Sequence, residues 1–295
     1  MALTAPRGRR VALALVLAVA AGLCAFIARP GEASPTSGTS ASVAELSKRL
    51  PFYDLLYART DADTRIARAE QQDTIDCMAK HGFRYTPAPV VSTSQATGDH
   101  PQPFGLETLV QPADTTPGLV PSEKPESKAF TQALFGDPDK RISAQGKLVR
   151  ATRPANGCQA HSEKQLLGND RVRWLQLRIQ LGEGEEQARQ QLEKDHAFRV
   201  VNAGWRQCMS EAKFRGQKDP VSLLYGLPRN ADPSKNALAR ADIRCKGETN
   251  YLTIAYTRLA AVQQAWLRDH AGTLAAWNAL QRRQDTIARE LLSSR

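Results

Sequence analysis

The stretch CMAKHGFR at residues 77–84 returns later in the chain as CMSEAKFR at residues 208–215. Both copies read Cys-Met, four further residues, then Phe-Arg. Each copy closes a segment with helical spacing of apolar residues and is followed by a loop that contains Gly and Pro. One further cysteine follows each copy, Cys158 after the first and Cys245 after the second. The repeat therefore predicts two related helical units, each closed by one disulfide.

The pairing of the cysteines follows from the same repeat. Four cysteines can pair in three ways, and the repeat favours Cys77 with Cys158 and Cys208 with Cys245. Loops of that length each stabilise a fold by roughly 4 kcal/mol in the chain-entropy treatment. Four buried free thiols are the alternative to this pairing.

Zinc is a further alternative at the first cysteine pair. Cys77 and His81 lie four residues apart, and Cys158 and His161 lie three apart, so a bond between the cysteines would bring both histidines to one place. The second repeat has no matching histidines, and the spacings are not those of a common zinc module. We therefore predict disulfides, and neither a metal site nor a cofactor.

The N-terminal sequence indicates the cellular compartment of the protein. An apolar run from Val11 to Ala28 follows three arginines, which is typical of an export signal. We expect residues 1–33 to be a signal peptide cleaved after Ala33, or a membrane anchor if cleavage does not occur. Residues 34–41 then form a spacer. This places the protein outside the cytoplasm, secreted or anchored to the membrane, where cysteines are oxidised.

The charge balance limits the partners. The chain carries 40 Lys and Arg against 30 Asp and Glu, a formal net charge of +10. A basic surface outside the cell favours phosphate-rich wall polymers or lipid headgroups, whereas nucleic acid is excluded by export. A solvated surface without a specific partner accounts for the same composition.

The fold class follows from the helical runs. We predict an all-α protein, a bundle of long helices or helical hairpins, with a first unit over residues 42–168 and a second over 169–295. A long irregular loop at residues 86–125 is rich in proline and lies within the first unit. Phe104 and Leu106 in this loop suggest that part of it lies against the helices.

Several helix boundaries can be placed. A first helix is expected from Phe52 to Lys80, and a break or kink at residues 182–184 because two glycines there cost roughly 2 kcal/mol of helix propensity. A new helix is then expected from Glu185. The C-terminal run is expected to turn at residues 269–272. Four of its residues, each seven apart, predict a packing seam: Cys245, Leu252, Leu259 and Trp266.

Catalytic motifs are absent from the sequence. We find no phosphate-binding loop, nucleophile elbow, metalloprotease motif or EF-hand loop. Glu183, Glu185 and Glu186 form an acidic cluster, but carboxylates at the start of a helix explain it better than glycosidase chemistry. No residue is therefore predicted to be catalytic.

The chain resembles a group of uncharacterised exported proteins and lipoproteins of high-GC actinobacteria. The likeness spans roughly residues 50–260. It depends on four short motifs: Cys77-Met78 with Phe83, Trp205 with Cys208-Met209, Gly157-Cys158 with a following Leu-Gly, and Ala241-Asp242-Ile243 with Cys245-Lys246. The resemblance implies a role in the cell envelope and no particular activity.

Together these features predict a non-catalytic, extracytoplasmic binding or accessory module of the cell envelope. The partner is expected to be an envelope protein or an anionic wall polymer, and the contact regions to be the loop at residues 86–125 and the basic surface. The alternative is a cell-envelope hydrolase whose site is assembled from residues far apart in the sequence.

Overall fold

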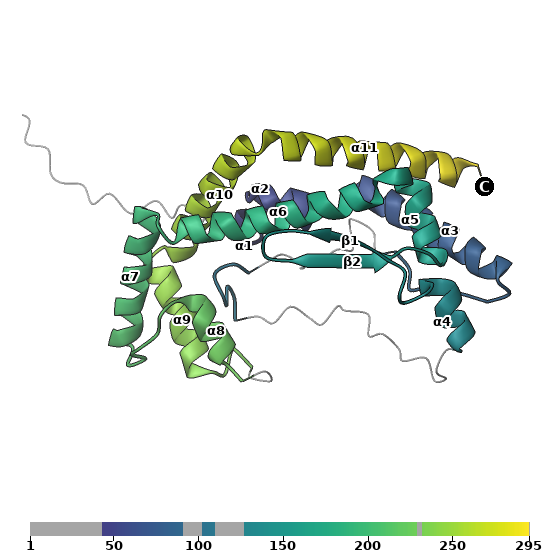
Figure 1. Ribbon diagram of the computed structural model, residues 1–295. Coiled ribbons are helices and arrows are strands. Elements are labelled where there is room, and N and C mark those ends of the chain that lie inside the picture. The colour runs from purple at the N-terminus through teal and green to yellow at the C-terminus, as the bar shows by residue number, and fades with distance from the viewer. Residues whose placement is uncertain (1–42, 91–101, 110–126, 229–231, 295) are drawn as a thin grey trace, which may run out of the picture. The chain divides into compact units, whose positions relative to one another are not determined.

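The computed structural model describes residues 43–90, 102–109, 127–228 and 232–294. Its helices are α1 (Val43–Lys48), α2 (Pro51–Leu56), α3 (Asp61–Lys80), α4 (Lys128–Phe135), α5 (Cys158–Leu167), α6 (Arg171–Leu192), α7 (His196–Glu211), α8 (Pro220–Gly226), α9 (Ala237–Glu248), α10 (Tyr251–Asp269) and α11 (Ala271–Ser293) (Figure 1). A 3-10 turn, η1 (Gly168–Asp170), joins α5 to α6. The predicted mostly helical fold is confirmed. None of the described helices is both long and apolar enough to cross a bilayer.

Parts of the sequence interpretation lie outside the described residues. These are the signal segment at residues 1–33, the spacer at 34–41 and most of the proline-rich loop, apart from residues 86–90 and 102–109. The boundary between the two predicted units falls within the described part. The helix ends, disulfides and buried clusters described below show how the two halves pack.

The first motif copy ends α3 with a cap made by its own backbone. Phe83 donates its N–H to the carbonyl of Met78 (3.0 Å), and Gly82 donates to that of Ala79 (2.9 Å), the paired hydrogen bonds of a Schellman cap. Gly82 has φ of 79°, a left-handed conformation that glycine adopts at no steric cost. Met78 is fully buried and Phe83 packs against its cluster. The Met and Phe of the motif therefore form the apolar contact across the cap.

The second copy ends α7 in the same way. Phe214 donates to Met209 (2.9 Å) and Lys213 donates to Ser210 (3.0 Å). Met209 is fully buried and Phe214 packs against its cluster. Lys213 takes the left-handed position, with φ of 71°, that glycine holds in the first copy. The motif is thus a signal for ending a helix, and the wider relation between the two units stays a prediction.

Both cysteine pairs are bonded in the arrangement that the repeat predicts. Cys77 of α3 is bonded to Cys158 at the start of α5, and Cys208 of α7 is bonded to Cys245 of α9. Cys158 and Cys245 are fully buried. Each disulfide therefore joins the last turn of a motif helix to a helix that follows it in the same half of the chain.

The expected single helix from Phe52 to Lys80 is wrong, because α2 and α3 are separate. Asp63 donates its N–H to Thr60 Oγ1 (3.1 Å), and Thr60 donates its N–H to Asp63 Oδ2 (2.8 Å). This reciprocal capping box starts α3 at Asp61. The interruption exposes the connection between α2 and α3, which forms one wall of the cleft described below.

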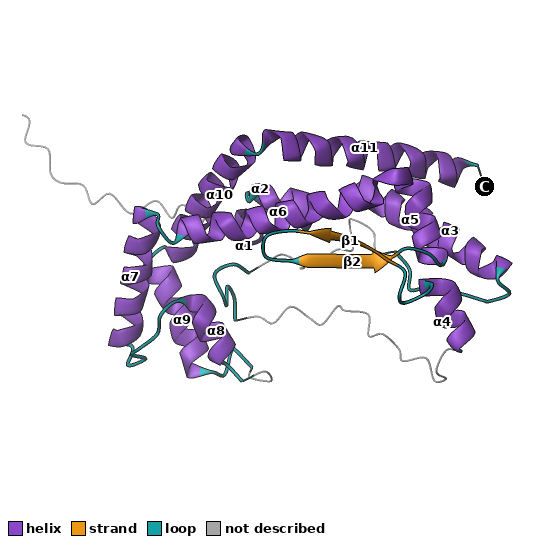
Figure 2. Ribbon diagram, in the orientation of Figure 1, coloured by secondary structure: helices purple, strands orange, loops and turns teal. Residues whose placement is uncertain are grey.

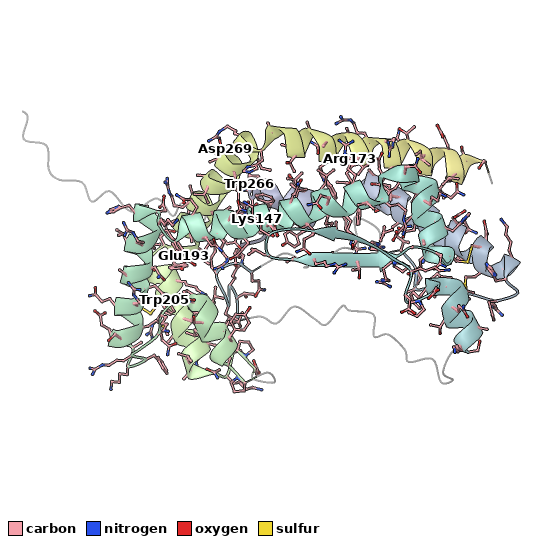
Figure 3. The ribbon with its side chains drawn as sticks, in the orientation of Figure 1. Lys147, Arg173, Glu193, Trp205, Trp266 and Asp269 are labelled. Carbon is pink, nitrogen blue, oxygen red and sulfur yellow. A yellow bond between two sulfur atoms is a disulfide. The ribbon has the colours of Figure 1, made fainter. Side chains whose placement is uncertain are left out.

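The expected break at residues 182–184 is also wrong, and so is the helix start at Glu185. α6 runs through this stretch without interruption. A Cβ atom on Gly184 would overlap the ring of Trp266, which lies where α10 packs on α6 (Figure 3). Glycine therefore allows the two helices to approach closely. The chain breaks later, where the Asp195 carboxylate caps α7 by accepting a hydrogen bond from Phe198 N–H (3.0 Å).

The C-terminal run contains one predicted turn and one that the pattern did not reveal. The turn at residues 269–272 is confirmed, with His270 between α10 and α11. A second interruption at Asn250, in the left-handed conformation with φ of 52°, separates α9 from α10. Cys245 and Leu259 of the expected seam are buried, and α10 packs against α6, α7 and α9.

A β-hairpin is the main element that the sequence interpretation missed. β1 (Arg141–Gln145) pairs antiparallel with β2 (Arg150–Pro154) to form the only sheet in the described part of the chain (Figure 2). Gly146 donates its N–H to the carbonyl of Val149 (2.8 Å) and closes the turn. Ala144 is buried against Leu175 and Ile179 of α6. The hairpin therefore lies on α6 and depends on it for burial.

The hydrophobic core crosses the boundary between the two predicted units. Phe52 shares a buried cluster with Leu181 and Trp277, and Ala69 shares another with Ala288. Contacts join the described residues into one compact unit. The two halves therefore share their buried clusters, and the division into two related units stays a prediction.

The short segment 102–109 lies against the second half of the molecule. Phe104 and Leu106 are buried, as expected for this part of the loop. The Lys246 ammonium donates to the Leu106 carbonyl and to Asp242 Oδ2 (2.8 Å). The hydroxyl of Tyr256 donates to Glu107 Oε1 (2.6 Å). Two buried polar contacts therefore anchor the segment.

Candidate functional site

The structure does not assemble the zinc alternative. Among the described residues, Cys77, His81 and Cys158 have ligand atoms within 4.8 Å of one another, but both sulfurs belong to the disulfide. The fourth predicted ligand, His161, instead has Nε2 3.6 Å from Asp73 Oδ2. These residues therefore form a disulfide with a neighbouring histidine.

The acidic cluster on α6 lies in the middle of the helix and not at its start. Glu183 accepts a hydrogen bond from the hairpin turn at Leu148 N–H (2.6 Å). Glu185 accepts one from the hydroxyl of Tyr57 (2.5 Å), and Glu186 pairs with Arg189 (2.7 Å). Each carboxylate thus has a structural partner, which argues against a catalytic pair here.

A cleft of about 620 Å³ lies between the α2–α3 connection, α6 and α11. Residues of α3, β2 and α5 complete its walls. Its apolar lining includes Leu55, Leu56, Ile66, Leu166, Trp174 and Trp277. Its polar lining includes Tyr57, Arg59, Glu70, Arg153, Glu163, Arg178, Arg282, Gln284 and Asp285. We call it the main cleft, and its volume is in the range of sites that bind small ligands or segments of polymers.

Two tryptophans form an aromatic wall of the main cleft. The rings of Trp174 and Trp277 have centroids 6.3 Å apart, and the Arg153 guanidinium lies 5.6 Å from the Trp174 ring centre. Trp277 is buried, so it belongs to the floor, whereas Trp174 is partly exposed. Such a pair offers a flat apolar surface beside a cation.

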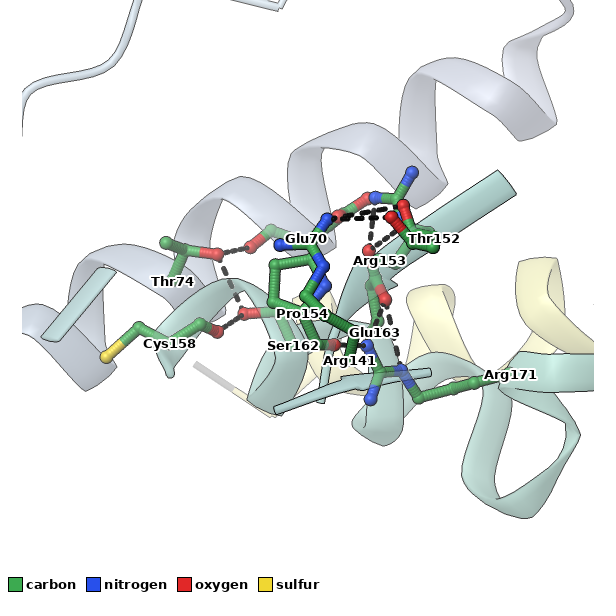
Figure 4. A network of polar contacts seen from close by, with 10 residues as sticks. All are labelled: Glu70, Thr74, Arg141, Thr152, Arg153, Pro154, Cys158, Ser162, Glu163 and Arg171. Atoms are coloured by element: carbon green, nitrogen blue, oxygen red, sulfur yellow. Dashed lines mark hydrogen bonds and ion pairs between the residues drawn. The ribbon is translucent and has the colours of Figure 1, made fainter. Parts of the chain in front are cut away.

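A buried ion network holds the end of the main cleft where β2, α5 and α6 meet (Figure 4). Glu163 accepts hydrogen bonds from Arg153 at Oε1 (2.5 Å) and from Arg171 at Oε2 (3.0 Å). Arg171 also donates to the carbonyl of Pro154 (2.7 Å). Both oxygens of Glu163 are therefore engaged. Removal of one partner from such a buried set leaves an uncompensated charge, which is strongly destabilising.

Glu70 is a carboxyl group of the main cleft whose pKa is raised by its surroundings. Burial raises the pKa of Glu70, the nearby Glu163 carboxylate raises it further, and Arg153 and Arg171 oppose the rise. Its carboxyl group makes no hydrogen bond to another described residue. Glu70 can therefore hold a proton more readily than an exposed glutamate, which is a property of general acids.

Several arginines of the main cleft lack an acidic partner. Arg59, Arg178 and Arg282 line it and form no ion pair with any described residue. Among the acidic residues of the lining, Asp285 instead pairs with Arg65 (2.8 Å) and Glu163 is engaged as above. Asp63 is engaged in the capping box of α3. Asp54 and Glu70 of the lining form no ion pair with any described residue, and the pKa of Glu70 is raised. Three unpaired arginines therefore exceed two unpaired carboxyl groups, and this excess of positive charge favours an anionic ligand.

Gln284 is a second observation that favours a ligand in the main cleft. Its side chain is only 5 % exposed, and its Oε1 has no hydrogen-bond partner among the described residues. Buried polar atoms are nearly always paired, so this oxygen can accept a hydrogen bond from a water or a ligand. Gln284 lines the main cleft beside Asp285.

Sequence patterns did not reveal this site. Trp277 continues the apolar pattern after the turn at residues 269–272, which predicts a core or seam residue, and its burial confirms this. The patterns indicate no site role for any of the other aromatic and charged residues of the main cleft. Trp174 and Arg178 are one helical turn apart on α6, which is the one local signal that a pattern search could have found. The remaining lining comes from segments far apart in the chain.

Comparison of the chain with protein-family models, with curated proteins and with solved structures found no match in any of the three.

Proposed function

We propose that this protein is a non-catalytic, extracytoplasmic binding protein of the cell envelope whose main cleft takes a segment of an anionic wall polymer. The N-terminal basic and apolar stretch supports export, and two disulfides suit an oxidising compartment. The resemblance of the Cys-Met motifs to exported actinobacterial proteins agrees with the same location.

The uncommitted arginines of the main cleft are the observation that carries the proposal. Arg59, Arg178 and Arg282 are exposed and have no acidic partner in the described part of the chain. Guanidinium groups bind phosphate through two parallel hydrogen bonds, which suits a phosphate-rich polymer. Trp174 beside them offers an apolar surface for the sugar or alkyl units between phosphates.

Sedimentation with purified cell walls tests the proposal. The full chain is expected to sediment with walls that retain their phosphate polymers and much less with walls from which these have been stripped. The double variant Arg178→Glu and Arg282→Glu is expected to bind at least about tenfold more weakly, because two attractive charges become repulsive.

A control with the same change of charge removes the effect of net charge alone. Arg173 and Arg199 are exposed and do not line the main cleft, so Arg173→Glu with Arg199→Glu alters the total charge equally. The proposal fails if this control weakens binding as much as the cleft variant. It also fails if stripped walls bind equally well.

A cell-envelope hydrolase is the second candidate, and Glu70 is the observation that favours it. A protonated Glu70 could act as a general acid, and Glu163 would be the partner carboxylate. Both oxygens of Glu163 are held by arginines, however, so Glu163 is not a free nucleophile or base, and binding is the better-supported role. Release of soluble fragments from walls that is lost in Glu70→Gln, with binding retained, would establish the hydrolase instead.

A further inference from the structure

A second depression lies beside the main cleft, between the hairpin turn and α6. Its volume is about 460 Å³, and we call it the hairpin groove. Its apolar lining consists of Leu148, Val149, Ala151, Trp174, Leu175 and Ile179. Arg153, Trp174 and Arg178 line both the hairpin groove and the main cleft. The two depressions therefore share one wall, formed by β2 and α6.

The turn of the hairpin displays two adjacent apolar side chains. Leu148 is 64 % exposed and Val149 is 52 % exposed. Their backbone is fixed, because Glu183 Oε1 accepts hydrogen bonds from Leu148 N–H (2.6 Å) and Val149 N–H (3.4 Å). A Cβ atom on Gly146 would overlap that same oxygen. The carboxylate therefore holds the turn close to α6 while both apolar side chains stay accessible.

The charges around the hairpin groove leave one cation uncommitted. Glu183 is engaged by the turn, Glu186 by Arg189 and Arg153 by Glu163. Arg178 is exposed and forms no ion pair with any described residue. An apolar groove with a free guanidinium in its lining is complementary to a molecule with an apolar chain and one acidic end.

We infer that the hairpin groove binds a single-chain amphiphile with an acidic head group. Its hydrocarbon chain lies against Leu148, Val149 and Ile179, and its carboxylate or phosphate binds Arg178. The inference goes beyond the proposed polymer binding and does not depend on it. A flat bilayer surface fits less well, since Leu175 and Ile179 of the apolar lining are buried.

Quenching of tryptophan fluorescence tests the inference, because Trp174 lines the hairpin groove. The probe is 12-bromododecanoic acid, added to the full chain below its micellar concentration. Saturable quenching is expected, and the brominated alcohol of equal length is expected to bind at least about fivefold more weakly because it lacks the charge. Arg178→Glu is expected to abolish the preference for the acid.

The hairpin itself is tested by Leu148→Ser with Val149→Ser, both at exposed positions that the fold does not need. This variant is expected to bind the acid at least about tenfold more weakly. The matched control changes Val200 and Tyr225, which are also exposed, to Ser and is expected to bind normally. Equal affinity of the hairpin variant and the control would overturn the inference.

Two further measurements distinguish the hairpin groove from a bilayer contact and from the main cleft. Binding to anionic vesicles without binding to the monomeric acid would mean a bilayer contact and would overturn the inference. Arg282→Glu, which alters only the main cleft, is expected to leave binding of the acid unchanged. Loss of wall binding in that variant, with the acid still bound, would show that the two sites succeed or fail independently.

Discussion

Glu107 couples the packing of segment 102–109 to pH. Its side chain is 5 % exposed, and burial raises its pKa to about 7, although the hydrogen bond from Tyr256 and the charge of Lys246 oppose the rise. An unfolded chain returns the group to its ordinary value of 4.5. Between these two values the folded protein binds more protons than the unfolded one, so its stability falls as pH rises through this window.

Because Glu107 loses its proton, the free energy of unfolding is expected to fall by about 2 kcal/mol between pH 5 and pH 8. Unfolding in urea at several pH values measures this fall. Glu107→Gln keeps an acceptor for the hydroxyl of Tyr256 but has no proton to lose. It is therefore expected to flatten most of this slope and to be more stable than the parent at pH 8. Glu211→Gln, at an exposed position, serves as control, and an unchanged slope in Glu107→Gln would refute the assignment.

Gly184 allows α6 and α10 to touch. Gly184→Ala is expected to lower the free energy of unfolding by about 1–3 kcal/mol, because the new methyl group overlaps the Trp266 ring. Gly182 is two residues away in the same helix, and nothing lies within 4 Å of an added Cβ. Gly182→Ala is therefore expected to raise stability by about 0.5–1 kcal/mol. Thermal unfolding of both variants measures the contrast, and equal effects would contradict it.

At the scale of the elements, the two motif helices differ at one capping position. Gly82 and Lys213 both adopt a left-handed backbone, which costs a side-chain-bearing residue about 1 kcal/mol. Lys213→Gly is expected to stabilise the protein by about that amount, and Gly82→Ala to destabilise it by a similar amount. Chemical denaturation measures both changes. The prediction requires that Lys213→Gly raise the stability and that Gly82→Ala lower it. A change in the same direction in both variants would mean that the two caps are not equivalent.

The helix boundaries show what local patterns can and cannot predict. The Cys-Met motif and the turn near His270 depend on short-range backbone bonds, so the sequence predicted both. The continuity of α6 could not be predicted in this way. Its glycines disfavour a helix locally, but burial of the Trp266 ring against Gly184 offsets that cost. The separate start of α3, by contrast, depends on the local Thr60 capping box.

At the scale of the whole molecule, each disulfide should contribute separately to stability. The bonded cysteines are separated by 81 and 37 residues, and either loop restricts the unfolded chain enough for about 2–4 kcal/mol. Replacement of Cys77 and Cys158 by Ala, or of Cys208 and Cys245 by Ala, is expected to lower the free energy of unfolding by that amount. Calorimetry measures both, and a loss below about 1 kcal/mol in either would contradict the prediction.

The main cleft could not be predicted from the sequence, because its walls come from helices that meet only in the folded chain. Arg65 and Asp285, for example, are 220 residues apart and still form an ion pair. Which arginines remain uncommitted depends on such pairings, and no spacing rule reveals them. The composition predicted an excess of positive charge, and the fold decides where that charge is available to a ligand.

The placement of the disulfides also has a mechanical consequence. If the chain is stretched from its two ends, tension passes across the Cys77–Cys158 and Cys208–Cys245 bonds and bypasses the residues between them. Those residues cannot lengthen under load until a reductant opens the bonds. At 3.6 Å per extended residue, opening would release about 290 Å and about 130 Å of additional length. The hairpin lies wholly inside the first bypassed stretch, so pulling on an oxidised molecule would not extend it, whereas Glu163 and Arg171 of the ion network lie outside that stretch.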